Sequence, residues 1–587
     1  MNLLYLGIWL STATQLVTAQ ALSTACRCRL NELCWPSEEG WKSLNDSVNG
    51  NLVRVRPVGD VCHGSAFDTE SCKEAIARTS DPEWRLSQPG ALMWTNWETL
   101  PEENEDCYLD TPRSRPCKQG RISPYAVLAQ TVGDIQKSLS FAKARNIHVV
   151  VRNTGHDMTG RSSGPSSLQI NLSKFKGINY TDHFVPRGGH KSLGKAATLE
   201  AATLGSEFSK DAVKNGYVPL VGLCSSVGMA GGYLQGGGLS SLAAIYGLAT
   251  EHALEFEVVT AAGDLVVANE FQNRDVFWAL RGGGGGTFGV AVRSTVRVFD
   301  DFPALYHVTQ ITVPDSYKNG SAKGSHTLWD VATHMLRLIP TIHDGKTSGN
   351  LGITRMSGNN ALVTMELVFT DTHNATAADN KLAELYSALQ ERGIPYNLTR
   401  NFLQSYSYMK RPVQSVGWGD YDASVLLSRQ FLTSTEAPSR MVSILSQINL
   451  GVGDSFEIDL IAGRAMHKDP VGTALHPSWK NSIALLTLHK NLSPSPTPEM
   501  QFQAQFELTN SVMPLFRSID TIHRQMGSYS NTADPNEPFF QQAFWGENYE
   551  RLSQIKRVWD KDEMFIARTT VGSEGWDSEG LCRVTKG

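Results

Sequence analysis

The sequence of 587 residues predicts an α+β fold built from more than one part. Between residues 121 and 302, β-branched strand patterns alternate with a helical pattern and with glycine-rich loops. Between 303 and 534, alternating strand patterns are interspersed with amphipathic helices, which is typical of an antiparallel sheet covered by helices. We therefore expect two folded parts, preceded by a cysteine-rich segment at 20–120 and followed by a short segment at 535–587.

Composition excludes some partners and indicates export. The formal net charge is −5 and no lysine or arginine cluster stands out, so nucleic acid is not an expected partner. Residues 1–19 carry an apolar run at 3–10 and end in small residues, which is typical of a secretory signal peptide. The run is too short to span a bilayer, and polar residues at 11–15 disfavour a signal anchor. We expect no stable membrane insertion.

The nine cysteines also favour an exported protein. Cys224 stands alone in the middle of the chain, and the other eight could form four disulfides, whose pairing the spacing does not reveal. They are Cys26, Cys28, Cys34, Cys62, Cys72, Cys107, Cys117 and Cys582. Seven N-x-S/T sequons, not all of which need be used, fit the same route: Asn45, Asn171, Asn179, Asn319, Asn374, Asn397 and Asn491. The prediction is secretion, or residence in the lumen of the secretory pathway.

A strand–helix–strand pattern begins at residue 125. Residues 125–129 resemble a strand, Asp134 can cap a helix, and residues 147–151 form a β-branched strand. That strand runs into a loop, and residues 167–172 alternate as a returning strand. Loops delivered by buried strands are common places for ligand binding.

The loop has the sequence V-V-V-R-N-T-G-H-D-M-T-G-R-S-S over residues 149–163. Gly155 and Gly160 allow successive backbone N–H groups to form an anion-binding nest, and Arg152 and Arg161 add positive charge. A pyrophosphate group is the expected ligand. The alternative is a tight surface turn, which two arginines, two glycines and His156 after a buried strand make the weaker interpretation.

A second glycine-rich stretch covers residues 221–247. Its glycines allow the backbone to approach a flat, bulky ligand, and the interleaved Val227, Met229, Tyr233 and Leu234 argue against a flexible linker.

A hairpin is expected at 254–267. The G-x-G-x-x-G at Gly284, Gly286 and Gly289 follows a helix and precedes a strand, the reverse of a nicotinamide-binding fingerprint. No metal-ligand spacing occurs, so no metal site is expected, and serine hydrolysis is not expected either.

Three blocks, at 149–163, 221–247 and 545–560, resemble flavoproteins of the vanillyl-alcohol oxidase superfamily, in the berberine-bridge-enzyme-like branch. The resemblance implies a two-part PCMH-type FAD-binding domain at 121–302 and a substrate domain at 303–534, with residues 535–587 returning to the first. It implies FAD bound covalently through His156, with a second link at Cys224, although a buried thiol is the alternative there. The C-W-P and V-C-H patterns of the cysteine-rich segment resemble fungal secondary-metabolism members.

The family register also implies a set of cofactor-binding residues. Besides His156 and Cys224 these are Arg152, Asn153, Thr154, Gly155, Asp157, Gly160, Arg161, Ser162, Val227, Gly228, Gly231, Gly232, Gly236, Gly237, Gly238, Val258, Asn548 and Tyr549. Asn548 and Tyr549 begin a helix whose apolar face is expected to contain Leu552, Ile555, Val558 and Trp559. Family members usually have proline after the aspartate of this block, where this chain has Lys561.

The implied activity is an oxidase that takes a hydride from a small organic molecule, such as an alkaloid or polyketide, and reduces O2 to H2O2. In the family a valine at the place of Val227 accompanies access of oxygen to the flavin. Carbohydrate or aromatic-alcohol oxidation is an alternative, and a flavin-bound cyclase without redox chemistry is an alternative of another class. The substrate, the choice between simple oxidation and cyclisation, and the oligomeric state cannot be predicted from the residues.

The catalytic base departs from the family pattern. Plant members have a glutamate on a substrate-domain strand where this sequence has His467. A histidine can accept a proton near neutral pH, although a solvated loop residue is a more favoured interpretation of His467 than a catalytic base. Glu457 and Asp459 alternate onto one face of an earlier strand and are the reserve candidates.

Overall fold

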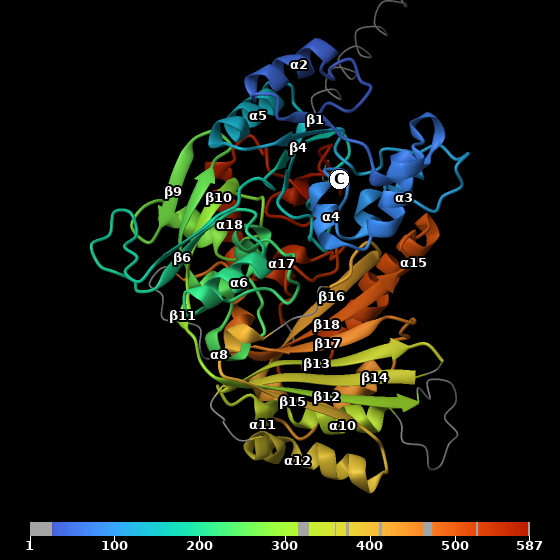
Figure 1. Cartoon of the computed structure of the whole chain (residues 1–587), viewed down its shortest axis with the longest axis vertical. Helices are drawn as coiled ribbons and strands as arrows, with labels where there is room; N and C mark the ends of the chain where they lie inside the picture. The colour runs from blue at the N-terminus through green and yellow to red at the C-terminus, as the bar shows by residue number, and fades with distance from the viewer. Residues whose placement is uncertain are drawn as a thin grey trace, which may run out of the picture.

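The computed structural model describes residues 26–314, 328–358, 360–370, 375–409, 414–461, 472–523 and 526–584, and in this part of the chain three sheets of four or more strands organise the fold (Figure 1). The expected signal peptide at 1–19, the sequons at Asn319 and Asn374, and His467 lie outside the described residues.

The first sheet has the order β1-β2-β4-β3. Its strands are β1 (Leu52–Arg54), β2 (Tyr125–Leu128), β3 (His148–Arg152) and β4 (Ser167–Asn171). Both β2 and β3 pair in parallel with β4, because α5 (Val132–Ala144) carries the chain from β2 to β3. The helix starts earlier than expected: Thr131 is its N-cap and Asp134 closes a capping box from the third helical position.

The second sheet is antiparallel, with the order β5-β6-β10-β8-β9. Its strands are β5 (Ile178–Thr181), β6 (Ala196–Glu200), β8 (Ala253–Val259), β9 (Leu265–Asn269) and β10 (Val290–Arg297). The expected hairpin is the β8–β9 pair, and the G-x-G-x-x-G lies between α9 (Arg274–Leu280) and β10, as the sequence predicted. A small separate pair joins β7 (Tyr217–Val218) to β11 (Phe299–Asp300), and β7 comes directly after α6 (Gly205–Lys214) in the chain.

The third sheet is antiparallel and has the order β15-β12-β14-β13-β17-β18-β16. Its strands are β12 (Ala304–Pro314), β13 (Thr347–Met356), β14 (Asn360–Phe369), β15 (Asn397–Leu403), β16 (Gly419–Ser428), β17 (Ser455–Leu460) and β18 (Ser482–Leu492). The alternating strand patterns expected between residues 303 and 534 are present as these strands.

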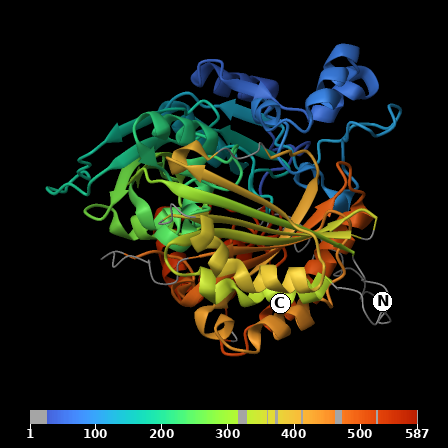
Figure 2. The same cartoon turned by 60° about the horizontal axis from the view of Figure 1, so that its bottom comes forward.

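Helices cover one face of this seven-stranded sheet, and the first half of the chain lies on the other side (Figures 1 and 2). The covering helices include α10 (Leu328–Arg337), α11 (Ile339–Ile342), α12 (Ala375–Glu391), α13 (Arg429–Leu432), α14 (Ala437–Leu445) and α16 (Met513–Arg517). Strand alternation sends apolar side chains such as Phe456 and Ile458 into the core with these helices. The intervening Glu457 and Asp459 therefore face the first half of the chain.

The remaining α-helices range from 3 residues in α7 to 12 residues in α18. They are α2 (Glu38–Ser47), α3 (Thr69–Arg78), α4 (Pro82–Ser87), α7 (Leu234–Gly236), α8 (Ala243–Tyr246), α15 (Pro498–Glu507), α17 (Phe540–Trp545) and α18 (Asn548–Trp559). No helix among the described residues combines the length and apolarity needed to cross a bilayer.

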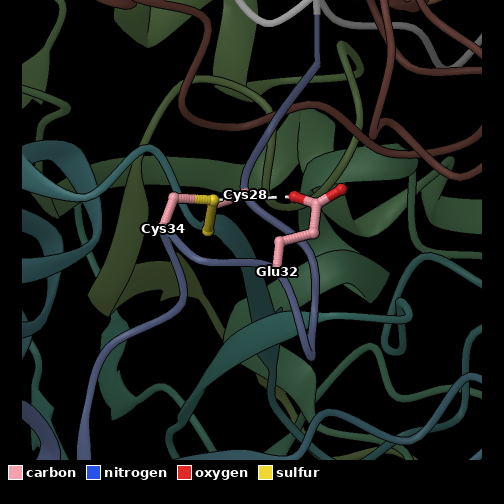
Figure 3. Close-up of side chains that lie close together, drawn as sticks. All are labelled: Cys28, Glu32 and Cys34. Carbon is pink, nitrogen blue, oxygen red and sulfur yellow. Dashed lines mark hydrogen bonds between the residues drawn. A yellow bond between two sulfur atoms is a disulfide. The ribbon is translucent and has the colours of Figure 1, made fainter.

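Four disulfides use the eight expected cysteines and leave out Cys224, which confirms the cysteine count. They join Cys26 to Cys582, Cys28 to Cys34, Cys62 to Cys72, and Cys107 to Cys117. Figure 3 shows the carboxylate of Glu32 beside the Cys28–Cys34 bridge, 3.6 Å from the Cys34 sulfur. Because both sulfurs are in the disulfide, neither is available as a thiolate ligand for a metal.

The C-terminal segment returns to the part of the chain that contains the first two sheets. α18 packs against α9, and the Lys556 ammonium donates to the Thr287 carbonyl (2.6 Å) while pairing with Asp560 (2.7 Å). Leu552 and Ile555 are buried as expected. Val558 was placed wrongly on the packed face, since its side chain is 73% exposed.

Candidate active site

A cavity of about 620 Å³ lies between the first half of the chain and the seven-stranded sheet. One wall is the loop that follows β3, and a second wall is the segment 222–233. The third wall is the sheet itself, through side chains of β13, β14, β16, β17 and β18. Parts of the sequence predicted separately as a cofactor site and a substrate domain thus border one space.

The loop after β3 is held by Asp157. Its carboxylate accepts hydrogen bonds from the backbone N–H groups of Thr159 (3.0 Å) and Arg161 (2.8 Å) and from the Arg161 guanidinium (2.7 Å). Burial by itself would raise the pKa of Asp157, but the charge and hydrogen bonds of Arg161 lower it below its ordinary value. Asp157 therefore remains ionised and fixes the turn around Gly160.

The same loop presents unused donors. None of the described residues accepts a hydrogen bond from the backbone N–H of Thr154, Gly155 or His156. The Asn153 side chain donates to the Ala201 carbonyl (2.6 Å), and a Cβ at Gly228 or Gly231 would lie 2.7 or 2.3 Å from its amide nitrogen. These two glycines are thus required for the close approach of segment 222–233 to the loop.

His156 borders the main cavity. Its Nε2 lies 2.7 Å from the hydroxyl oxygen of Ser226, and its carbonyl accepts a hydrogen bond from the Trp94 indole (3.4 Å). Burial lowers the pKa of His156 to about 4, so its imidazole is neutral at physiological pH. A neutral imidazole retains a lone pair for bonding to carbon.

Cys224 and Val227 border the same cavity. The half-buried Cys224 thiol donates to the side-chain carbonyl of Gln414, which also lines the space. Val227 donates its N–H to the Cys224 carbonyl (3.3 Å), so one tight turn places the thiol, the valine and Ser226 together. This turn brings Cys224 into the neighbourhood of His156.

A second, smaller cavity of about 80 Å³ lies behind the loop. Its lining includes Gly160, Arg161, Ser162, Gly231 and Gly232, together with Gly285, Gly286 and Gly289 from the segment 284–289 that contains the G-x-G-x-x-G. A Cβ at Gly285 would lie 2.6 Å from the Gly232 Cα, so three glycine-bearing loops meet there without side chains between them.

Three charged residues also line the second cavity. Glu579 pairs with both Arg121 and Arg568, and all three side chains line the space. This group could not be recognised from the sequence, because its members lie far apart in the chain and belong to no motif.

Several predicted cofactor-binding residues line neither cavity. The Arg152 guanidinium donates to the carbonyls of Arg85, Gln88 and Pro89, so it supports the loop from behind instead of facing an anion. Val258 lies behind Gly289, whose Cβ would approach it to 2.6 Å. Also outside the cavity linings are Gly236, Gly237, Gly238, Asn548 and Tyr549.

These outlying residues pack the segment that frames the site. A Cβ at Gly236 would lie 2.3 Å from the Asn531 side chain, and the N–H of Gly238 donates to the Tyr529 hydroxyl (3.1 Å). Asn548 donates to the Leu475 carbonyl (2.7 Å), and the Tyr549 hydroxyl donates to Glu574 (2.5 Å). These contacts hold the glycine-rich segment 236–238 and the start of α18 in place.

The sheet wall carries a polar cluster. His489 of β18 lies 2.8 Å from an Asp422 oxygen on β16 and 3.1 Å from a Glu457 oxygen on β17. Burial alone would lower the pKa of His489, but Asp422 and Glu457 raise it well above its ordinary value, so the ring is an imidazolium. Asp420, Asp422 and His489 are not among the residues predicted from the sequence, although D-Y-D at 420–422 in an apolar strand was a signal.

The two reserve base candidates differ in their surroundings. Glu457 receives hydrogen bonds from His489 and from the Asn350 amide, and these lower its pKa against the effect of burial. No described residue donates a hydrogen bond to the Asp459 carboxyl. Burial, and then the charge of Glu457, raise the pKa of Asp459 well above its ordinary value. The two carboxyls thus suit different roles.

Comparisons with known proteins agree with this geometry. Residues 123–269 match the family described as FAD binding domain, and residues 528–572 match the family described as Berberine and berberine like. The chain is 42% identical over 553 residues to the flavin-dependent oxygenase ucdF of Aspergillus ustus, covering 93% of this chain and 99% of the relative. The chain belongs to the berberine-bridge-enzyme-like flavoproteins. It is an FAD-dependent oxidoreductase.

Other members of this family support the assignment. The FAD-linked oxidoreductase malF of Malbranchea aurantiaca is 39% identical, with 96% of this chain and 95% of the relative covered. The solved structure of the VAO-type flavoprotein MtVAO615 from Myceliophthora thermophila C1 is 28% identical. It superposes with a TM-score of 0.82 over 95% of this chain and 100% of its own length. The α+β fold and the predicted family are therefore confirmed.

The residues present fit FAD. The unused N–H groups of Thr154, Gly155 and His156 are suited to anionic oxygens, and the glycines of the second cavity leave room for a ligand against bare backbone. The main cavity, of about 620 Å³, lies within the range of typical cofactor and ligand sites, roughly 300–1,000 Å³. The residues that would hold the cofactor are thus the loop 153–162, the segment 222–233 and the glycines at 285–289.

Proposed function

We propose that this protein is a secreted or secretory-pathway oxidase that takes a hydride from a small organic molecule and reduces O2 to H2O2. The proposed substrates are secondary metabolites of the alkaloid or polyketide kind, which undergo oxidation or oxidative cyclisation. The observation that carries the proposal is the position of His156 and Cys224 in one cavity, opposite a sheet wall with buried acid–base groups. FAD, when bound, supplies the hydride acceptor and the route of electrons to oxygen.

We infer covalent attachment of FAD through His156 and Cys224. A neutral His156, with its lone pair, and a thiol on a turn braced by the Val227–Cys224 hydrogen bond provide two nucleophiles in one cavity. The hydrogen bond between Ser226 and His156 would orient the ring. Two covalent bonds would hold the cofactor rigidly against the loop.

The same geometry supports different roles for the carboxyls of Glu457 and Asp459. We infer that Asp459 removes the proton that leaves the substrate when the hydride is taken, because its oxygens are not bound by a described residue and its pKa is raised. Glu457, which is hydrogen-bonded to His489 and Asn350, would hold the neighbouring charged side chains in place. His467, outside the described residues, remains a candidate base.

Oxygen uptake, peroxide formation and anaerobic bleaching of the flavin test this proposal together. The substrate to use is the metabolite that accumulates when the protein is absent from its producing organism. Bleaching by that metabolite, followed by peroxide release in air, is the expected result. A yellow protein that the metabolite never reduces, although it is converted, would instead identify a cyclase without redox chemistry.

A further inference from the structure

The sheet wall of the main cavity contains more acidic groups than basic ones. We define the acidic wall as Asp420 and Asp422 of β16, Glu457 and Asp459 of β17, and His489 of β18. Register places Asp422 opposite His489, and strand alternation places Asp420 on the same face as Asp422. Five side chains from three adjacent strands thus point into the cavity, and four of them are carboxyls.

His489 does not provide hydrogen bonds to all the oxygens of these carboxyls. Its two nitrogens are used by one oxygen of Asp422 (2.8 Å) and one oxygen of Glu457 (3.1 Å). The second Asp422 oxygen and the Asp420 Oδ1 have no hydrogen-bond partner in the described part of the chain, although these residues are only 0% and 7% exposed. Buried carboxyl oxygens without donors are costly, about 1–3 kcal/mol each or more when charged, which favours a ligand that donates to them.

Aromatic side chains lie on the same cavity surface. Trp94 and Trp418 pack edge to face with ring centroids 5.5 Å apart, and both line the space that Asp420 and Asp422 border. Indole faces attract cations, and this attraction adds to that of carboxylates. Among the described residues that line the cavity there is no lysine or arginine to neutralise the wall.

We propose that Asp420 and Asp422, together with Trp94 and Trp418, form a subsite for the protonated amino group of the substrate. This inference rests on the proposed function, because it names the substrate class of the same cavity as aliphatic or cyclic amines. A divalent metal ion is the competing cation. It is disfavoured because both His489 nitrogens bind carboxylates, so the ring offers no lone pair without breaking one of those bonds.

Binding of a cation should release protons. Asp420 is faced by Asp422 on its own strand, by His489 on β18 and by Asp454 before β17. Burial, and then the charge of Asp422, raise its pKa well above the ordinary range, so the free site holds a proton that a bound ammonium group displaces. The affinity for a cation should therefore increase with pH, by up to about tenfold per unit for one released proton.

The test is calorimetry on the flavin-loaded protein with two probes of similar shape. One probe is 2-phenylethyl-trimethylammonium, whose charge does not titrate, and the other is neutral 2-phenylethanol. The variants are Asp420→Asn and Asp422→Asn. Asp379→Asn is the matched control, because Asp379 lies on α12 over the opposite face of the sheet and pairs with Arg400. Thermal unfolding and retained flavin absorbance establish that each variant is folded.

The cation should bind at least about tenfold more tightly than the alcohol, and each cavity variant should remove most of that difference while the control keeps it. Cation binding by the native protein should also strengthen from pH 5.5 to 7.5 with proton release, a result that needs no variant. Equal binding of both probes would overturn the proposal, and so would binding of Mn²⁺ that Asp420→Asn abolishes while the ammonium probe fails to bind. Because no turnover is measured, failure of the oxidase proposal would not produce either result.

Discussion

The imidazole Nε2 of His156 lies 2.7 Å from the hydroxyl oxygen of Ser226, although the two residues belong to different glycine-rich stretches. Gly228 and Gly231 make this approach feasible, because any Cβ there would clash with Asn153. The contact joins the loop after β3 to the turn that carries Cys224 and Val227. The two walls of the proposed flavin site are thus one hydrogen-bonded unit.

Flavin attachment should depend on His156 and Cys224 separately. Native protein precipitated with acid should stay yellow, and the peptide that contains His156 should carry the flavin mass. Cys224→Ala should leave flavin on His156 alone and slow its reduction, whereas His156→Ala should leave at most the Cys224 link. Ser226→Ala serves as a comparison, because it keeps both attachment residues and removes only the hydrogen bond that would orient the imidazole. Release of all flavin from the native protein into the supernatant would contradict the covalent assignment.

Val227 should keep the site open to oxygen. Its half-buried side chain lines the main cavity, and leucine adds one methylene to that surface. Val227→Leu should slow reoxidation of the reduced enzyme in air more than reduction by substrate, as stopped-flow measurement of the two half-reactions would show. Val368→Leu adds the same methylene from the sheet side and should not single out the oxygen step. Equal slowing of both half-reactions by Val227→Leu would indicate disturbed packing instead.

Much of the fold could be predicted because local patterns dominate it. The β-branched run before His156 and the turn at Gly263 each produce one element almost regardless of distant contacts. The position of Val558 could not be predicted, because helical periodicity gives a face only to within a residue or two, and here Leu552 and Ile555 fill the packed side. Asn171 shows the same limit for sequons, since its side chain is buried in β4 against Gln169.

Residues that line the two cavities could be predicted from the sequence only where they form contiguous motifs. The loop at His156 and the turn at Cys224 are such motifs. Arg152 was misjudged because the residue type fits a phosphate, whereas its guanidinium is used by three carbonyls of the cysteine-rich segment. Asp422 and His489 meet only through the pairing of β16 with β18, and no spacing along the chain reveals that register.

The stability of the fold should fall on acidification through His148. Its Nε2 donates to the Ile566 carbonyl (3.0 Å), its Nδ1 is buried without a partner, and burial, then the charge of Arg27, lower its pKa to about 3. The unfolded chain takes up a proton near pH 6.5 while the folded chain does not, so stability is full above pH 6.5 and is lost as pH falls. The loss attributable to this residue is about 2 kcal/mol at pH 5.

Urea titrations of the native protein and of His148→Gln at pH 7.5 and pH 5 measure that loss. Glutamine can still donate to Ile566 but has no proton to gain, so the variant should lose less stability between the two pH values. The matched control is His183→Gln, at an exposed loop position, which should keep the native pH dependence. Parallel pH profiles for the native protein and His148→Gln would show that the buried imidazole does not set the acid limit.

The choice of catalytic base can be decided by comparing Asp459→Asn with Glu457→Gln. The Asp459 carboxyl receives no hydrogen bond from a described residue and has a raised pKa, whereas Glu457 is held by His489 and Asn350. If Asp459 takes the substrate proton, Asp459→Asn should slow anaerobic flavin reduction by about 10²-fold or more. It should also abolish the rise of that rate with pH, because the asparagine cannot ionise.

Glu457→Gln should keep most of the rate but shift the pH profile, since it alters the charge that Asp459 faces. Both variants should retain covalent flavin, as neither touches the loop at His156. Near-native reduction by Asp459→Asn with an unchanged profile would contradict the assignment and leave His467 as the residue to replace.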